Sequence, residues 1–270
     1  MAKDIIIGID AGTSILKVVA FTLNGKEIAS SSKKNIYKTS HGGQATQSLD
    51  ATWKNCIKII SELKNKINNF KDRVAIISVT GQGDGTWLID KKGKPVCDAW
   101  LWLDSRSSDI AKKLSKLNSE KLRFDLTGTG IFAGQQSSQI SYMDKNNPEI
   151  LDQSSTAFHC KDWIYFKLTN VRATDPSEAC FTFGNFRTRQ YDENVIDGLG
   201  LTKRKNLLPD IIDGSKVTHP LSDNVATLIG LNSGTPIALG YIDAVCTFLG
   251  SGGLDINKDV GNSILGTTGG

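Results

Sequence analysis

The sequence predicts a mixed α/β layer fold, in which helices flank a mixed sheet. Two apolar runs at residues 5–9 and 15–21, separated by a short polar turn, are typical of a buried β-hairpin. Apolar residues at helical spacing over residues 49–67 predict an amphipathic helix, and the apolar run at 74–79 predicts another buried strand. Strands and helices in this order favour a layered α/β domain.

The remaining elements of the first hundred residues follow from turn signals and β propensity. Asn24-Gly25 is a strong two-residue turn signal and leads into a third strand over residues 27–37. A polar, glycine-containing stretch at 39–46 predicts a loop before the helix. The β-prone residues 86–89 predict extended chain rather than a helix after the glycine-rich segment that precedes them.

The middle and last thirds of the chain carry weaker patterns. Residues 107–168 are predicted to be mostly helical, with Ser107 or Ser108 as the N-cap of the first helix. Residues 181–191 predict a hairpin that turns around Gly184-Asn185. Two short strands are expected in the last third, one of them just after Gly234-Thr235, before a glycine-rich closing stretch.

Composition excludes several classes of protein. The 270 residues, 39% hydrophobic and 22% charged, are enough for one large globular domain or two modest ones. The net charge of +4 comes from scattered lysines without a basic stripe, so no nucleic-acid partner is expected. Five widely spaced cysteines without a C-x-x-C pair argue against zinc and favour a reducing compartment. Since no apolar segment is long enough to span a membrane, we expect a cytoplasmic protein without a membrane partner.

The first hairpin has the chemistry of a phosphate and metal site. Asp10 ends its first strand, Gly12 permits a tight turn, and Thr13, Ser14 and Lys17 add hydroxyl and ammonium donors. Such a turn can bind an anion through its N–H groups while the acid holds a hydrated Mg²⁺. A nucleoside triphosphate with Mg²⁺ is a ligand that uses both, although taken alone an ordinary hairpin with a solvated acid explains the motif about as well.

A second candidate site lies in the glycine-rich segment Gly81-Gln82-Gly83-Asp84-Gly85. The glycines allow a ligand to approach the backbone, and Gln82 and Asp84 can bind hydroxyl groups. The segment is not a dinucleotide fingerprint, because no helix follows it, and the chain contains no P-loop motif. Asp10, Asp84, Asp104 and Asp243 all end apolar runs, where an open α/β sheet presents ligand-binding groups.

Aromatic side chains accompany one of these acids. Trp100 and Trp102 alternate on a segment that ends in Asp104 and Arg106. An indole face beside a carboxylate suits a sugar or polyol, while two core tryptophans are the alternative, stronger for Trp100 than for Trp102. The three histidines are isolated, so neither a triad nor a metal site is indicated, and His159 is expected to be a satisfied buried side chain.

Six motifs in a fixed order resemble the FGGY family of carbohydrate kinases, and the resemblance covers essentially the whole chain. They are Asp10-Ala-Gly-Thr-Ser-x-x-Lys17, the Gly81–Gly85 loop, Leu101–Arg106, Thr174–Ala179, Gly240–Asp243 and Gly266–Gly269. Gln82–Trp87, Ala99–Asp104 and Phe181–Arg187 look most like the erythritol kinases. The resemblance implies an actin-like, ribonuclease H-like fold and ATP-dependent phosphorylation of a hydroxyl of a small polyol, with erythritol as the expected substrate.

The resemblance also implies roles for particular residues. Asp10 would coordinate Mg²⁺ through water, and Asp243 would be the catalytic base that accepts the substrate's hydroxyl proton. The groups expected at the phosphates of ATP are Gly12, Thr13, Ser14 and Lys17, and a second phosphate loop formed by Gly266, Thr267, Thr268 and Gly269. The groups expected at the substrate are Gln82, Gly83, Asp84 and Trp102, to which we add Asp104 and Arg106 from the pattern above. Glycerol kinases carry arginine and glutamate at the positions of Gly83 and Asp84, which argues against glycerol.

FGGY kinases have two domains, and the resemblance divides this chain unequally between them. Residues 1–256 are expected to form the N-terminal, substrate-binding domain, and residues 257–270 the start of the ATPase domain, so this chain alone is expected to be inactive. A homodimer is a possible oligomeric state of such a kinase. Three alternatives remain open: a pentulose kinase of the xylulose type, a metal nuclease that uses Asp10, Asp84 and Asp243, and a non-catalytic sugar-binding domain.

Overall fold

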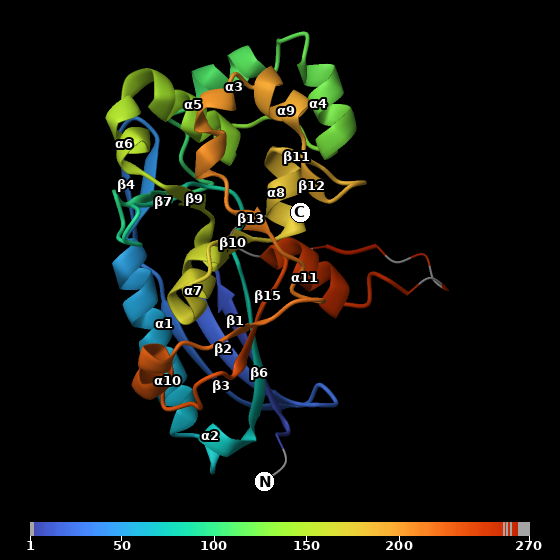
Figure 1. The fold of residues 1–270 in the computed structure, drawn as a ribbon. Coiled ribbons are helices and arrows are strands. Elements are labelled where there is room, and N and C mark those ends of the chain that lie inside the picture. The colour runs from blue at the N-terminus through green and yellow to red at the C-terminus, as the bar shows by residue number, and fades with distance from the viewer. Residues whose placement is uncertain (1–2, 256, 258, 260, 264–270) are drawn as a thin grey trace.

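The computed structural model describes residues 3–255, 257, 259 and 261–263. Its largest sheet has six strands in the order β14-β15-β6-β1-β2-β3, and this sheet is mixed (Figure 1). β1 pairs antiparallel with β2 and parallel with β6, and β15 continues the parallel part. The strands are β1 (Ile5–Ala11), β2 (Ile15–Thr22), β3 (Glu27–Lys34), β6 (Val74–Gly81), β14 (His219–Pro220) and β15 (Pro236–Leu239). The predicted mixed sheet is confirmed.

Helices cover the sheet. α1 (Leu49–Lys64) packs against β2 and β3, and α7 (Cys160–Thr169) packs against β1, β6 and β15. α1 begins where the Ser48 hydroxyl accepts the Ala51 N–H at 3.3 Å, and it also contacts α7 and α10 (Asp223–Ile229). In Figure 1 these helices lie on one side of the sheet, whereas α11 (Asp243–Gly250) lies on the other. Helices thus flank the sheet as predicted.

The core between the sheet and its helices consists of apolar side chains that alternate along the strands. Ile5, Ile7 and Ile9 of β1 are fully buried, and they pack with Ile59 and Ile60 of α1. Burial of a side chain of this size stabilises the fold by roughly 1.5–3 kcal/mol. This alternation leaves Asp10 of β1 on the opposite face from the core.

The upper part of the molecule in Figure 1 is built mainly of short elements around a second apolar cluster, which includes Leu88, Ile140 and Met143. Its small sheets pair β4 with β5, β5 with β8, β7 with β9, β10 with β13 and β11 with β12. These strands are β4 (Tyr37–Ser40), β5 (Gln44–Gln47), β7 (Trp87–Ile89), β8 (Ala99–Trp100), β9 (Thr156–Phe158), β10 (Ala173–Thr174), β11 (Gly184–Asn185), β12 (Gln190–Tyr191) and β13 (Asp210–Ile211).

The remaining helices of the described residues are α2 (Phe70–Arg73), α3 (Ser108–Leu114), α4 (Glu120–Thr127), α5 (Gln136–Asn146), α6 (Pro148–Gln153), α8 (Pro176–Thr182), α9 (Glu193–Gly198) and the 3₁₀ helix η1 (Thr202–Leu207).

The structure corrects the predicted loop at residues 39–46, where β4 and β5 form an antiparallel hairpin. The sequence there is polar and gives no hydrophobic period, and the hairpin is completed by pairing with β8, which is distant in sequence. The third predicted strand ends at Lys34 rather than at residue 37. The Asn35 N–H still donates to the Ser14 carbonyl oxygen at 2.9 Å, next to the last pair of the ladder, and residue 37 already belongs to β4.

From residue 107 on, the structure confirms two expectations and corrects two others. Residues 107–168 are mostly helical as predicted, with only the short strand β9 between α6 and α7. Ser107 occupies the N-cap position of α3 as predicted, but its hydroxyl accepts no N–H of the helix and donates to the Ala133 carbonyl oxygen at 2.6 Å. The hairpin predicted around Gly184-Asn185 is displaced: these residues form its first strand, and residue 181 still belongs to α8. After this hairpin, the described residues contain three short strands, β13, β14 and β15, rather than the two that were expected.

The described residues include no helix that is both long enough and apolar enough to cross a membrane.

Candidate active site

The candidate residues lie at or just after the carboxyl ends of three strands, at one edge of the large sheet. β1, β6 and β15 run parallel, so their carboxyl ends meet at the same edge. Asp10 stands near the end of β1, Gln82 follows β6 directly, and Asp243 comes four residues after the end of β15. The negative charge of Asp10 contributes to raising the pKa of Asp243, so the two carboxyl groups are close enough to interact electrostatically. Ligands of open α/β sheets bind at such an edge.

The turn of the first hairpin is held rigidly. Asn35 Nδ2 donates to the Gly12 carbonyl oxygen at 2.7 Å, and a Cβ atom at Gly12 would lie 2.8 Å from the Ile15 carbonyl oxygen. Asp10 stands directly opposite Lys17 in the strand register. Desolvation raises the pKa of Asp10, and the charge of Lys17 partly offsets this rise. The hairpin therefore presents a carboxylate beside an ammonium group.

The Thr13 hydroxyl connects this hairpin to the glycine-rich loop and to Trp102. It donates to Gln82 Oε1 at 2.9 Å and accepts the Trp102 indole N–H, also at 2.9 Å. Gln82 is 2% exposed and donates from Nε2 to Gln47 Oε1 at 3.3 Å. Because the single hydroxyl proton of Thr13 is used in this way, Thr13 joins the first hairpin to the glycine-rich loop instead of offering that proton to a ligand.

Asp84 is the buried acid of the glycine-rich loop. It is 7% exposed, its φ of 53° is left-handed, and its backbone N–H donates to Glu178 Oε2 at 3.3 Å. Its Oδ1 atom has no hydrogen-bond partner among the described residues, and burial raises the pKa of its carboxyl group. A buried carboxyl with an unused oxygen is suited to a hydroxyl ligand.

The close approach of Ile242 explains why the residue before Asp84 is a glycine, Gly83. A Cβ atom there would lie 1.8 Å from Ile242 Cδ1, since the Ile242 side chain packs directly against the loop. Ile242 immediately precedes Asp243 in the chain. Because Gly83 has no side chain, the glycine-rich loop can contact the segment that carries the candidate base.

That segment is anchored at three points. The Gly240 N–H donates to the Val79 carbonyl oxygen at 2.7 Å, the Thr80 hydroxyl donates to the Tyr241 carbonyl oxygen at 2.5 Å, and the Ile242 N–H donates to the Ser177 hydroxyl oxygen at 3.0 Å. Asp243 is then the first residue of α11. Desolvation raises its pKa to about 6, although the Ala244 N–H, which donates to Oδ1 at 2.7 Å, opposes the rise. A carboxylate of this pKa is ionised at neutral pH and can accept a proton.

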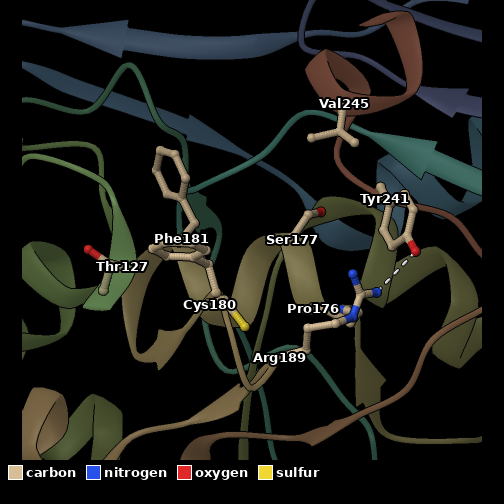
Figure 2. Close-up of a pocket in the computed structure, with 9 residues that line it drawn as sticks. Thr127, Pro176, Ser177, Cys180, Phe181, Arg189, Tyr241 and Val245 are labelled. Carbon is tan, nitrogen blue, oxygen red and sulfur yellow. Dashed lines mark hydrogen bonds between the residues drawn. The ribbon is translucent and has the colours of Figure 1, made fainter. Parts of the chain in front are cut away.

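A pocket of about 290 Å³ adjoins the same segment (Figure 2). Tyr241 and Val245 form one wall, and Phe181 and Cys180 of α8 lie across from them. Arg189 donates to the Tyr241 hydroxyl at 3.1 Å. The pocket shows that the residues flanking Asp243 border open space as well as packed protein.

Asp104 and Arg106 are used within the chain. The Asp104 carboxylate is 1% exposed and accepts the Ala45 N–H at 2.9 Å and Arg106 Nη2 at 2.7 Å. The Arg106 guanidinium group also lies 3.2 Å from the centre of the Trp100 ring. Trp100 is therefore a buried core residue, whereas Trp102 is half-buried. The assignment of Asp104 and Arg106 to the substrate stays a prediction, and this geometry supports a structural role better.

The sequence analysis missed a buried charge network behind Asp84. Lys161 Nζ lies 2.7 Å from Asp162 Oδ1 and 2.6 Å from Asp175 Oδ1, and all three side chains are fully buried. His159 is buried as expected and contacts Asp162 through Nδ1. It is not fully satisfied as predicted, because its Nε2 has no hydrogen-bond partner among the described residues and lies 3.7 Å from Glu178 Oε2. Asp175 and Glu178 had one sequence signal, the motif Thr174–Ala179, but the motif did not show which of its polar residues turn inward.

Two other expectations concern metal and phosphate. The second phosphate loop, Gly266 to Gly269, lies outside the described residues. In the part of the chain that is described, no group of three or more His, Cys, Asp or Glu side chains could hold a metal ion. Asp10, Asp84 and Asp243 consequently do not form the metal cluster that the nuclease alternative needs.

The first hairpin, the glycine-rich loop and the segment before α11 therefore contact one another at one edge of the large sheet. The chain belongs to the FGGY family of carbohydrate kinases: the model of the family's N-terminal domain matches residues 5–250. Over 98% of its length the chain is 53% identical to the erythritol kinase of Brucella abortus (strain 2308), of which it covers 51%. It is also 25% identical over 97% of its length to the L-xylulose/3-keto-L-gulonate kinase of Escherichia coli (strain K12), of which it covers 52%.

Solved structures confirm the fold. A xylulose kinase from Rhodospirillum rubrum superposes with a TM-score of 0.85 at 22% identity, covering 92% of this chain and 52% of that one. A ligand-bound xylulose kinase from Lactobacillus acidophilus gives 0.83 at 25% identity, covering 93% and 50%. The actin-like, ribonuclease H-like fold that the resemblance implied is therefore correct. The chain spans about half the length of the curated relatives it matches.

Proposed function

We propose that this chain is the substrate-binding half of an ATP-dependent kinase that phosphorylates a hydroxyl of a small polyol, erythritol above all. In this proposal residues 1–256 form the N-terminal domain and residues 257–270 begin the ATPase domain. The observation that carries it is the contact between Gly83 and Ile242, which sets the buried acid of the glycine-rich loop beside the segment of the candidate base. The 53% identity to an erythritol kinase supports the choice of substrate.

Each part of the site has a role in this proposal. The hairpin residues Asp10, Gly12, Ser14 and Lys17 face the phosphates of ATP, with Asp10 holding Mg²⁺ through water. A carboxylate suits such an ion, and the Lys17 ammonium group opposite it suits phosphate oxygens; both would neutralise phosphate charge. Asp243 accepts the proton of the attacking hydroxyl. Since phosphoryl transfer has a loose transition state, positioning and charge neutralisation account for most of the catalysis.

The partners follow from the same proposal. The substrate is a small polyol or sugar, and neither a nucleic acid nor a membrane takes part. The proposed kinase is cytoplasmic, where ATP is available, and it forms a homodimer. A pentulose kinase of the xylulose type is the second candidate, because the relatives include L-xylulose and xylulose kinases.

The decisive experiment is a substrate screen with the full-length kinase. Tetritols, pentitols and pentuloses are each supplied with Mg-ATP, and ADP release is measured. We expect erythritol to give the highest kcat/KM. A higher kcat/KM for a pentulose would favour the second candidate, and ligand binding without ADP release from any compound would indicate a sugar-binding domain.

Asp84→Ala is expected to weaken polyol binding about ten- to a hundredfold, because it removes a hydrogen bond to a charged or buried carboxyl, worth roughly 1.5–3 kcal/mol. ATP binding should be unchanged, since Asp84 lies outside the phosphate hairpin. Calorimetry with each ligand measures both affinities. Asp109→Ala, at an exposed position of α3, is the matched control. Unchanged polyol affinity in a folded Asp84 variant would assign Asp84 a structural role.

The pH profile should show an acid limb that belongs to Asp243. Its pKa is raised to about 6, so the base is ionised above this pH and protonated below it. We expect kcat/KM for the polyol to be level near pH 7–8 and to fall about tenfold per unit below roughly pH 6. The profile is measured at fixed Mg-ATP, with circular dichroism as the control for folding at each pH. A profile that stays level to about pH 5 would contradict the assignment.

A further inference from the structure

Helix α8 holds both loops of the candidate site through two adjacent residues. The Ser177 hydroxyl oxygen accepts the Ile242 N–H at 3.0 Å, next to Asp243. Glu178 Oε2 accepts the Asp84 N–H at 3.3 Å. α8 starts at a fixed place, because Pro176 occupies its first turn and the Asp175 carboxylate caps it through the Ser177 N–H at 2.7 Å. The start of this helix therefore sets the spacing between the two loops.

The contact with Glu178 stabilises a backbone conformation that a side chain disfavours. Asp84 has a φ of 53° and Gly85 a φ of 74°. A left-handed residue that is not glycine costs free energy and persists when its surroundings hold it. Besides Glu178, the loop is held by the Gly85 N–H, which donates to the Gly134 carbonyl oxygen at 3.0 Å. Losing the Glu178 acceptor would leave a buried N–H without a partner in the strained residue itself.

The surroundings of Glu178 leave its charge incompletely balanced. Its side chain is fully buried, and its Oε1 has no hydrogen bond within the described part of the chain. The charged groups that act on it are His159 before α7, Lys161 and Asp162 of α7, and Asp84 from the glycine-rich loop. Asp175 at the start of α8 lies beside Lys161. Lys161 is neutralised by its close contacts with Asp162 and Asp175, so His159 is the nearest balancing cation.

Two buried carboxyl groups beside one imidazole do not both ionise readily at neutral pH. Burial raises the pKa of Glu178 and of Asp84. Burial also disfavours the charged form of His159, but the charges of Glu178 and Asp162 outweigh this effect and raise its pKa. A carboxyl that keeps its proton can donate a hydrogen bond as well as accept one. A polyol hydroxyl both donates and accepts hydrogen bonds, so a pair of carboxyl groups of which one is protonated and one is ionised suits it.

We propose that Glu178 is a positioning residue for the polyol site, which fixes Asp84 through its N–H and shares one proton with the Asp84 carboxyl group. The proposal rests on the proposed function, because it assumes that Asp84 binds a substrate hydroxyl. Glu178 itself does not need to touch the substrate. It acts by fixing the direction of the Asp84 carboxyl and its protonation state.

The test compares two substitutions in the full-length kinase. Glu178→Gln keeps an oxygen that can accept the Asp84 N–H but removes the second acid, whereas Glu178→Ala removes both. Glu149→Gln, at an exposed position of α6, is the matched control. KM for erythritol, KM for ATP and kcat are measured between about pH 5.5 and 9, together with the melting temperature of each variant.

We expect Glu178→Ala to raise the erythritol KM about tenfold or more, with the ATP KM within about twofold of the wild type. In the wild type the erythritol KM should rise at alkaline pH, as the pair loses its shared proton. In Glu178→Gln this rise should move to lower pH by about one unit or more, because Asp84 no longer has an acidic neighbour. A purely structural role of Glu178 would lower the melting temperature without moving this profile.

The outcomes separate the two proposals. If the wild type phosphorylates polyols but the Glu178→Gln profile coincides with that of the wild type, the positioning role is wrong and the proposed function stands. The same holds if Glu178→Ala raises both KM values equally. If the wild type phosphorylates no polyol, both proposals fail.

Discussion

Replacing Asp243 by asparagine is expected to lower kcat of the full-length kinase about 10²–10⁴-fold and to leave polyol affinity nearly unchanged. Asparagine has the same shape and keeps an oxygen that can accept the Ala244 N–H, so the start of α11 is preserved. It cannot accept the proton of the attacking hydroxyl, which is the role we propose for Asp243. The neighbouring anchors at Gly240, Tyr241 and Ile242 do not involve the Asp243 side chain.

An assay of ADP release gives kcat, and calorimetry gives the polyol affinity in the same preparation. Asp50→Asn, at an exposed position in the first turn of α1, is the control for a neutralised acid outside the site. A variant that retained more than about a tenth of the wild-type rate would show that Asp243 is not the base.

Residues 1–270 alone are expected to fold but to release no measurable ADP from Mg-ATP and erythritol. Two buried apolar clusters give this chain its own core, which supports independent folding. The helix that carries Asp243 is different: α11 has no buried residue although most of its side chains are apolar. Because FGGY relatives are about twice as long, we infer that a second domain covers this helix and closes the site.

Circular dichroism and thermal melting establish whether the isolated chain is folded, and the full-length kinase is the positive control for ADP release. Weak polyol binding by the isolated chain is compatible with the proposal, because the glycine-rich loop Gly81–Gly85 lies entirely within the described residues. Turnover of erythritol near the full-length rate would overturn the two-domain division and the inference that α11 needs a cover.

Local patterns determined the elements on which the site is built. Alternating or continuous apolar runs identified β1, β2 and β6, and helical spacing identified α1, since each pattern reflects burial within one element. The pattern of Asp10 and Gly12 also identified the hairpin turn, because a tight turn requires particular residues at particular places. Polar strands such as β5 escaped detection, because their stability comes from pairing with a distant strand and not from their own period.

The sequence by itself also determined which residues have the chemistry for a kinase site, namely the acids at the strand ends and the glycines between them. Only the tertiary structure decided how they are used. Thr13 bonds Gln82 69 residues away, Trp102 bonds Thr13 across 89 residues, and Asp84 bonds Glu178 across 94. These contacts depend on strand order and on where α8 begins, which no local pattern encodes. The contacts of Asp104 with Arg106 and the Ala45 N–H likewise depend on the tertiary structure, while its predicted role at the substrate stays a prediction.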